Sequence, residues 1–310
     1  MTKCGAFPRG AAMLALVCLL AGFLPGRPAW AGAADTAGAP IVIGTTHRLP
    51  SAVLGDTREL NVRLPAGYGA GDRAYPVVYL LDGGLEQDFG HIAGLAQLGD
   101  LSGTFGPFIL VGVQTRTRRA ELTPPASDPR YRAAFPDAGG AERFRRFLSE
   151  EVFPFVAARY RTDGRRAVMG ESLAGLFVVD TLLRAPTLFQ DYIAISPSLW
   201  WDDRSGLRDP GPRLDLAALK GRRLFLAMAN EGGTMQSGVD GLREALEARP
   251  APGFAWRYSD RSATDTHATI LHSAAEDAFR AFYAAPPIDY GPTPWFMIEG
   301  ASPPPAAQSR

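Results

Sequence analysis

The stretch Val168–Val179 constrains the fold of this chain more than any other. A short apolar strand leads into Gly170-Glu171-Ser172, and an apolar helix follows from Leu173. This is the layout of a nucleophile elbow, where a serine occupies a tight turn between a strand and a helix with its hydroxyl exposed. The alternative is that Ser172 only caps the helix. Because apolar segments flank the serine on both sides, we expect Ser172 to be a nucleophile.

The elbow departs slightly from the G-x-S-x-G pattern. Gly170 stands two residues before the serine, where a side chain would collide with the crossing helix. The second small position holds Ala174, and Gly175 follows it. The pattern is therefore one methyl group short of the strict form, and we expect the elbow to form but to be slightly opened.

Apolar runs that alternate with helical patterns predict an α/β fold with a mostly parallel central sheet and helices on both faces. Two early segments alternate polar and apolar residues, as paired, half-exposed strands do, whereas the later runs are continuously apolar, as buried parallel strands are. The polar stretch 114–140 predicts a long functional or mobile loop. The expected strands are 41–48, 58–64, 75–81, 108–113, 166–169, 192–196, 224–229 and 254–258, and the expected helices are 141–159, 173–184, 239–248 and 270–283.

The N-terminus has the pattern of a secretory signal peptide. Lys3 and Arg9 precede an apolar run from Ala11 to Leu24, and Ala29-Trp30-Ala31 offers small residues at the cleavage spacing. The run is too short for a stable membrane anchor. We therefore expect a signal peptide over 1–31, one domain over 32–310 with a loose Pro-rich tail from about residue 286, and secretion to the periplasm.

Composition excludes several functional classes. Cys4 and Cys18 both lie in the predicted signal, so the mature chain has no disulfide, thiol nucleophile or cysteine-based metal site. The signal removes three basic and no acidic residues, and the slight acidic excess that remains does not suggest nucleic-acid binding. We expect no metal and no cofactor, and the sequence makes no prediction of the oligomeric state.

A serine nucleophile needs a base and a group that orients the base. The only lysines are Lys3 and Lys220, so histidine is the better candidate. His267 follows the last expected strand through a loop, from which it can reach over the strand ends. His272 lies inside a helix and is the alternative base. The i, i+5 spacing of these two histidines does not put both on one helical face, which argues against a metal site.

The orienting acid should follow a strand between the serine and the histidine in the chain. Glu231 does so, and Asp265, two residues before His267, is the competing candidate. Backbone N–H groups must also stabilise the charge that develops on the substrate's carbonyl oxygen. We expect one such donor at Leu173 and the other in the glycine turn after strand 75–81, at Gly83 or Gly84.

Taken together, these residues resemble the putative esterase family of α/β-hydrolases, within it the enterochelin-esterase-like branch. The resemblance covers about residues 45–282 and implies an α/β-hydrolase fold in which Ser172, Glu231 and His267 are nucleophile, acid and base. Glu171 departs from the family, which often has histidine there. The matching motifs are Tyr68 with its glycines, Tyr75–Gly83, Glu121-Leu122-Thr123-Pro124, Phe147–Arg161, Gly170–Phe177 and Ser196-Pro197-Ser198-Leu199-Trp200-Trp201-Asp202.

The substrate is less constrained. Trp200 and Trp201 follow a strand end and either wall a pocket or pack in the core. Arg119, with Arg116 and Arg118, either meets an anionic substrate or forms a solvated basic loop. The resemblance implies a secreted serine esterase that acts through an acyl-enzyme on a small-molecule ester, such as a siderophore trilactone or a small acyl ester. An acyltransferase and a non-catalytic ligand-binding protein of the same fold are the alternatives.

Overall fold

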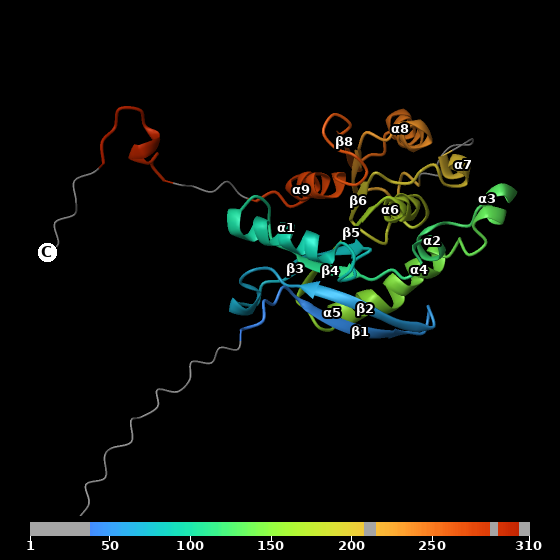
Figure 1. Cartoon of the computed structure of the whole chain (residues 1–310), viewed down its shortest axis with the longest axis horizontal. Coiled ribbons are helices and arrows are strands. Elements are labelled where there is room, and N and C mark those ends of the chain that lie inside the picture. The colour runs from blue at the N-terminus through green and yellow to red at the C-terminus, as the bar shows by residue number, and fades with distance from the viewer. Residues whose placement is uncertain (1–37, 208–214, 286–290, 304–310) are drawn as a thin grey trace, which may run out of the picture. The chain divides into compact units, whose positions relative to one another are not determined.

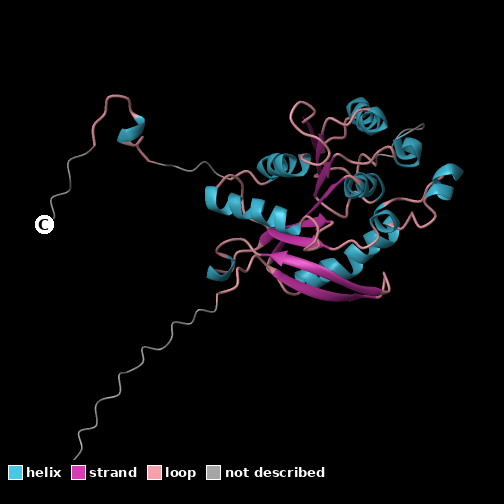
Figure 2. Cartoon of the chain, in the orientation of Figure 1, coloured by secondary structure: helices cyan, strands magenta, loops and turns pink. Residues whose placement is uncertain are grey.

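An eight-stranded sheet runs through the middle of the molecule with helices on both sides (Figures 1 and 2). The computed structural model describes residues 38–207, 215–285 and 291–303. The predicted signal peptide lies outside these residues. Residues 42–310 group into one unit by their contacts.

The strands lie in the order β1-β2-β4-β3-β5-β6-β7-β8. β1 pairs antiparallel with β2, and β2 with β4, whereas every other neighbouring pair is parallel. This is the mostly parallel α/β-hydrolase sheet expected from the sequence. The strands are β1 Thr45–Ser51, β2 Asp56–Arg63, β3 Tyr75–Leu81, β4 Ile109–Val113, β5 Thr162–Glu171, β6 Asp191–Ile195, β7 Arg223–Met228 and β8 Ala255–Asp260.

Side chains of the central strands alternate between two apolar cores, because successive strand residues point to opposite faces. On one face Val78 and Met169 pack with α1 (Phe89–Ser102) and α9 (Ile270–Phe282). On the other face, Tyr79, Val168 and their neighbours pack with a second set of helices. Those helices are α4 Ala141–Phe147, α5 Phe153–Ala157, α6 Leu173–Arg184 and α8 Gly233–Ala248. Continuous apolar strands are thus buried on both faces, as the sequence predicted.

The single helix expected over residues 141–159 is interrupted. A π-helical turn, Leu148–Val152, separates α4 from α5. Pro154 occupies the first turn of α5 and has no N–H to donate to the turn before it, so the wider turn accommodates the missing bond. The residues are helical as predicted, but the α-helix is interrupted before Pro154, which the sequence analysis did not predict.

The stretch 114–140 is not a structureless loop. It contains α2 (Arg118–Leu122) and α3 (Pro129–Ala134), and the side chain of Asp128 caps α3 by accepting from the Arg130 N–H. The buried carboxylate of Asp202, in α7 (Trp201–Arg204), accepts hydrogen bonds from the backbone N–H groups of Ser127 and Asp128. These hydrogen bonds anchor a segment for which the sequence predicted a long functional or mobile loop.

Short 3-10 turns complete the described chain. They lie at Tyr68–Ala70, Ser205–Leu207 and Trp295–Met297. The side chains of the last turn are exposed, Phe296 to 69%. The described part of the Pro-rich tail is therefore not buried in the core.

Candidate active site

The turn between β5 and α6 has the backbone geometry of a nucleophile elbow. Ser172 has a φ of 60° and a ψ of −118°, a combination that non-glycine residues rarely adopt. A Cβ on Gly170 would lie 2.6 Å from the Cβ of Ala174, so the missing side chain makes room for that methyl group. Gly175, not residue 174, makes the close approach to the carbonyl oxygen of Ile195. The glycine that helix packing requires is therefore still present, displaced by one position.

Backbone hydrogen bonds fix Ser172 against the next strand. Its N–H donates to the Ile195 carbonyl at 3.0 Å, and its own carbonyl accepts from the Ser198 N–H at 2.9 Å. The hydroxyls of Ser172 and Ser198 lie 3.3 Å apart. Sequence reasoning missed Ser198 as a polar neighbour, although it follows β6, which pairs directly with β5.

The loops after β7 and β8 bring His267 and Glu231 together. Nδ1 of His267 lies 2.9 Å from Oε1 of Glu231. The Glu231 side chain is 8% exposed and that of His267 is 44% exposed, so a buried carboxylate holds an accessible imidazole. The Asn230 N–H donates to the Asp265 carbonyl at 3.0 Å and ties the two loops to each other.

The two competing candidates have other partners. The Asp265 carboxylate pairs with Arg261 at 3.2 Å and accepts from the Ser273 hydroxyl at 3.1 Å. Nδ1 of His272 lies 3.1 Å from Nε2 of His91 on α1. The structure therefore brings Glu231, not Asp265, to the imidazole of His267, and it places His272 between two helices.

Glu171 connects the elbow electrostatically to the histidine loop. Burial raises the pKa of its carboxyl to about 7, and His267 opposes this rise through its charge, which places the imidazole within electrostatic reach of the residue before Ser172. Asp88 and Glu231 raise the pKa further, and Arg118 lowers it. Glu171, the residue before Ser172, thus shares an electrostatic neighbourhood with His267 and Glu231.

Arg118 is held at the elbow by the turn after β3. Its Nε donates to Oδ2 of Asp82 at 2.8 Å, and its Nη2 lies 3.4 Å from the carbonyl oxygen of Glu171. The Asp82 carboxyl is buried, and burial raises its pKa against the opposing effects of Arg118 and the Thr115 hydroxyl. The position predicted as a solvated or substrate-binding arginine is therefore engaged with a carboxylate.

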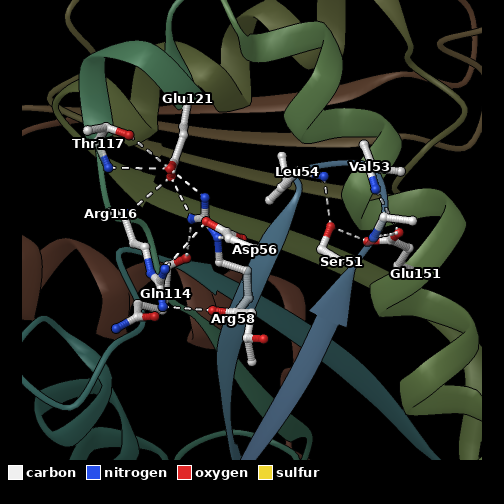
Figure 3. Close-up of polar contacts among 12 residues, drawn as sticks. Ser51, Val53, Leu54, Asp56, Arg58, Gln114, Arg116, Thr117, Glu121 and Glu151 are labelled. Atoms are coloured by element: carbon white, nitrogen blue, oxygen red, sulfur yellow. Dashed lines mark hydrogen bonds and ion pairs between the residues drawn. The ribbon is translucent and has the colours of Figure 1, made fainter.

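A buried ion pair fixes the segment that carries Arg118 (Figure 3). Both oxygens of Glu121 accept from the guanidinium of Arg58 on β2, at 2.7 and 3.0 Å, and both side chains are 4% exposed. Glu121 also accepts from the N–H groups of Arg116 and Thr117. Burial opposes its ionisation, but the Arg58 hydrogen bonds and charge hold the pKa of Glu121 below its usual value. Sequence reasoning noted the Glu121 motif but not this partner.

The prediction of Gly83 as an oxyanion donor is wrong. Its N–H donates to the Val113 carbonyl at 2.9 Å, which extends the pairing of β3 with β4. A Cβ there would lie 2.3 Å from Cα of Gly112, so the glycine serves a close backbone approach. The Gly84 N–H is bonded to the side chain of Gln87 at 2.9 Å.

By contrast, the structure gives the N–H groups of Leu85 and Leu173 no acceptor among the described residues.

The predicted substrate-binding residues fall into two groups. Trp201 is 3% exposed, its Nε1 donates to the Pro124 carbonyl, and its ring packs on Phe135, so most of it lies in the core. It also lines a small cavity with Pro124 and Leu176 of α6, so its role in substrate binding stays a prediction. Trp200 is half-buried beside Tyr131. The guanidinium of exposed Arg119 lies 4.4 Å over the Phe135 ring. Tyr131 and Phe135 line a surface cleft with Arg130, Ala134 and Asp203.

The described residues contain neither a metal-ligand cluster nor a membrane-spanning helix. Within 38–207, 215–285 and 291–303, no three histidine, cysteine or acidic side chains converge as a metal site would require. In the same part of the chain, no helix combines the length and the apolar character that crossing a membrane would need.

Comparison with known proteins identifies the family. Residues 51–232 match the family described as Putative esterase. A solved IroE-like serine hydrolase from Shewanella oneidensis is 30% identical, with a TM-score of 0.67 over 77% of this chain and 80% of that one. The match is long enough on both sides to relate the two domains as a whole.

Curated relatives match over shorter lengths. The ferri-bacillibactin esterase BesA of Bacillus subtilis is 34% identical over 145 residues, which is 41% of this chain and 49% of that protein. The apo-salmochelin esterase of Escherichia coli is 32% identical over 136 residues, or 40% of this chain and 42% of that protein. The matched segments thus span about half the length of these relatives.

We predict that Glu121→Gln lowers the free energy of unfolding by about 2 kcal/mol, because it removes the carboxylate that accepts two hydrogen bonds from the buried Arg58 guanidinium and leaves only Asp56 as its charge partner. Chemical denaturation monitored by circular dichroism measures the change. The matched control is Glu142→Gln, which removes an exposed carboxylate from Arg145 and should change stability by less than ~1 kcal/mol. Equal effects of the two substitutions would contradict the anchoring role.

Proposed function

Because this chain belongs to the Putative esterase family, we propose that it hydrolyses carboxylic esters with Ser172 as the nucleophile. The observation that carries the proposal is the 2.9 Å contact between His267 Nδ1 and Glu231 Oε1 beside an elbow that holds Ser172 at a φ of 60°. A nucleophile, a base and an orienting acid in one neighbourhood are the parts that serine hydrolysis needs.

In this proposal, Glu231 fixes the tautomer of His267. The carboxylate accepts a hydrogen bond from the Nδ1–H group, which keeps the proton on Nδ1 and leaves Nε2 unprotonated and able to take the proton of the Ser172 hydroxyl. The oxygen of Ser172 then attacks the ester carbonyl, and the imidazolium returns the proton to the leaving alcohol. Water, activated by the same imidazole, releases the acid from the acyl-enzyme.

The developing oxyanion requires two N–H donors. Leu173 supplies one from the first turn of α6, where helix N–H groups lack intrahelical partners. We assign the second to Leu85 in place of Gly83, because β3 pairs with β5 and the turn after β3 therefore adjoins the elbow. The Asn61 side chain donates to the Gly83 carbonyl at 2.8 Å and steadies this turn.

We further propose that the substrate is a siderophore-type ester and that the protein is secreted to the periplasm. The substrate rests on the names of the curated relatives, two of which are esterases of ferri-bacillibactin and apo-salmochelin. The half-buried Trp200, beside Tyr131 of α3, and the exposed Arg119, over the ring of Phe135 just after α3, are the candidate contacts for an aromatic chelating group. Secretion rests on the signal pattern of residues 1–31.

We expect the purified chain to hydrolyse p-nitrophenyl esters of short acids and to be labelled by a fluorophosphonate at Ser172, because only an activated serine reacts with that reagent. Mass spectrometry of the labelled peptide locates the adduct. Ser172→Ala should lose both labelling and hydrolysis.

Ser198→Ala is the matched control, since it removes the hydroxyl that lies 3.3 Å from that of Ser172 and should retain the label. Active protein that carries the label elsewhere, or carries none, contradicts the assignment. Appearance of a transesterified product with an added alcohol, in preference to the free acid, would identify the enzyme as an acyltransferase.

Glu231→Gln should lower kcat by about a hundredfold or more, because an amide can no longer select the tautomer or stabilise the imidazolium. Asp265→Asn should change kcat only slightly, since its carboxylate is engaged with Arg261 and Ser273. Steady-state kinetics at pH 8 on variants with native circular dichroism spectra makes the comparison. A crippling effect of Asp265→Asn, or wild-type rates in both variants, would exclude Glu231 as the acid.

A further inference from the structure

Glu171 is a carboxyl group in an unusual place. It directly precedes Ser172 and is the last residue of β5, so the strict geometry of the elbow fixes its backbone. It is half-buried, and it lies within electrostatic reach of both members of the His267–Glu231 pair. The proposed catalytic steps give its side chain no role.

Two acidic and two basic groups surround Glu171. The titratable and charged groups that act on it are His267, Asp88, Arg118 and Glu231. Arg118, the one arginine among them, is already paired with the buried carboxylate of Asp82 at 2.8 Å. Glu231 is likewise paired with His267 at 2.9 Å, whereas Glu171 makes no ion pair among the described residues. An anion that approaches Ser172 therefore meets the unpaired carboxyl of Glu171.

The other arginines of the same segment do not pair with Glu171 and have other contacts. Arg116 donates to the Thr57 carbonyl and lies 3.5 Å from Asp56, on the side of β2. Arg119 lies over the Phe135 ring, 4.4 Å from its centroid.

We infer that Glu171 is a specificity-determining residue, which makes the site accept uncharged esters and disfavour esters with an anionic group near the scissile bond. When ionised, a carboxyl group beside the nucleophile raises the energy of a bound anion in both the ground state and the transition state, and the oxyanion formed during attack adds to the repulsion. This inference rests on the proposed function, because it describes the selectivity of the same serine site.

Siderophore esters differ in charge according to whether they carry iron. A siderophore that binds iron through deprotonated oxygens is more anionic in its ferric form than in its protonated, iron-free form. The names of the relatives distinguish a ferri-siderophore esterase from an apo-siderophore esterase. For this chain, the carboxylates at the elbow favour the uncharged, iron-free ester.

Discrimination against anionic esters should become stronger as the pH rises. Burial, Asp88 and Glu231 raise the pKa of Glu171 to about 7, so its carboxyl is mostly neutral at pH 6 and mostly ionised at pH 8. Discrimination against anionic esters is therefore weak at pH 6 and strong at pH 8. A ratio of two substrates isolates this effect, because the titration of the catalytic base affects both substrates alike.

The test compares two p-nitrophenyl esters of matched size, the valerate and the hemiglutarate, which differ mainly by the carboxylate at the end of the acyl chain. The measured quantity is kcat/KM for the neutral ester divided by kcat/KM for the anionic ester. In the wild-type chain this ratio should rise from pH 6 to pH 8. In Glu171→Gln the ratio should be about tenfold lower than wild type at pH 8, which is the size expected for the removal of one unit charge near a protein surface. The ratio of this variant should also be nearly independent of pH.

The matched control is Glu244→Gln, which removes an exposed carboxylate from α8 and should leave the ratio at its wild-type value. Glu171→His is a second variant at the elbow, in case Glu171→Gln does not fold, and it should lower the ratio at least as far. A wild-type ratio that is the same at pH 6 and pH 8 and unchanged in both Glu171 variants overturns the inference while leaving the serine mechanism intact. Loss of hydrolysis of both esters together with absence of fluorophosphonate labelling in the wild-type chain overturns the proposed function itself.

Discussion

The parallel pairing of β5 with β3 and β6 is the constraint on which the site depends. Parallel strands end at the same edge of a sheet, so the turns after β3, β5, β6, β7 and β8 are all delivered to one side. The Ser172 N–H donates to the last carbonyl of β6, and the Asn230 N–H links the loops after β7 and β8. The elbow and the Glu231–His267 pair, which are far apart in the chain, are thus brought to the same edge of the sheet by the direction of the strands.

A second layer of buried polar contacts holds the loops over that edge. The Arg58–Glu121 pair fixes α2, α2 carries Arg118, and Arg118 bridges Asp82 to the carbonyl of Glu171. Asp202 fastens the start of α3 in the same way. Buried ionic groups contribute little net stability in many proteins, but they specify one arrangement because any other would leave a charge unpaired. In this chain the arrangement they specify is the rim of the proposed active site.

The sequence predicted the elements whose signal is local or periodic. The elbow, the central apolar strands and helix Leu173–Arg184 could be read directly because burial on both faces leaves a continuous apolar run. The fold of residues 114–140 and the hydrogen bond of the Gly83 N–H could not be predicted, because both depend on partners distant in the chain. Nothing near Glu121 indicates that Arg58 will meet it, and a glycine turn looks the same whether its N–H is free or bonded to Val113. Trp201 was ambiguous for the same reason.

Glu171 gives the proposed site a property that the fold alone does not confer. The elbow, the His267–Glu231 pair and the free N–H of Leu173 are compatible with many esters, whereas the charge of the residue before the nucleophile affects which of them can approach. A single side chain at a backbone position fixed by the fold can thus alter selectivity without altering the geometry of the reaction.

The most direct measurement of the central claim is a crystal structure of the chain after reaction with a small alkyl phosphonate, whose tetrahedral phosphorus mimics the attacked ester carbon. The account predicts phosphorus bonded to the Ser172 oxygen, the phosphonyl oxygen accepting from the N–H groups of Leu173 and Leu85, and Nδ1 of His267 on the Glu231 carboxylate. An adduct on another residue, or an imidazole turned to Asp265, would contradict it.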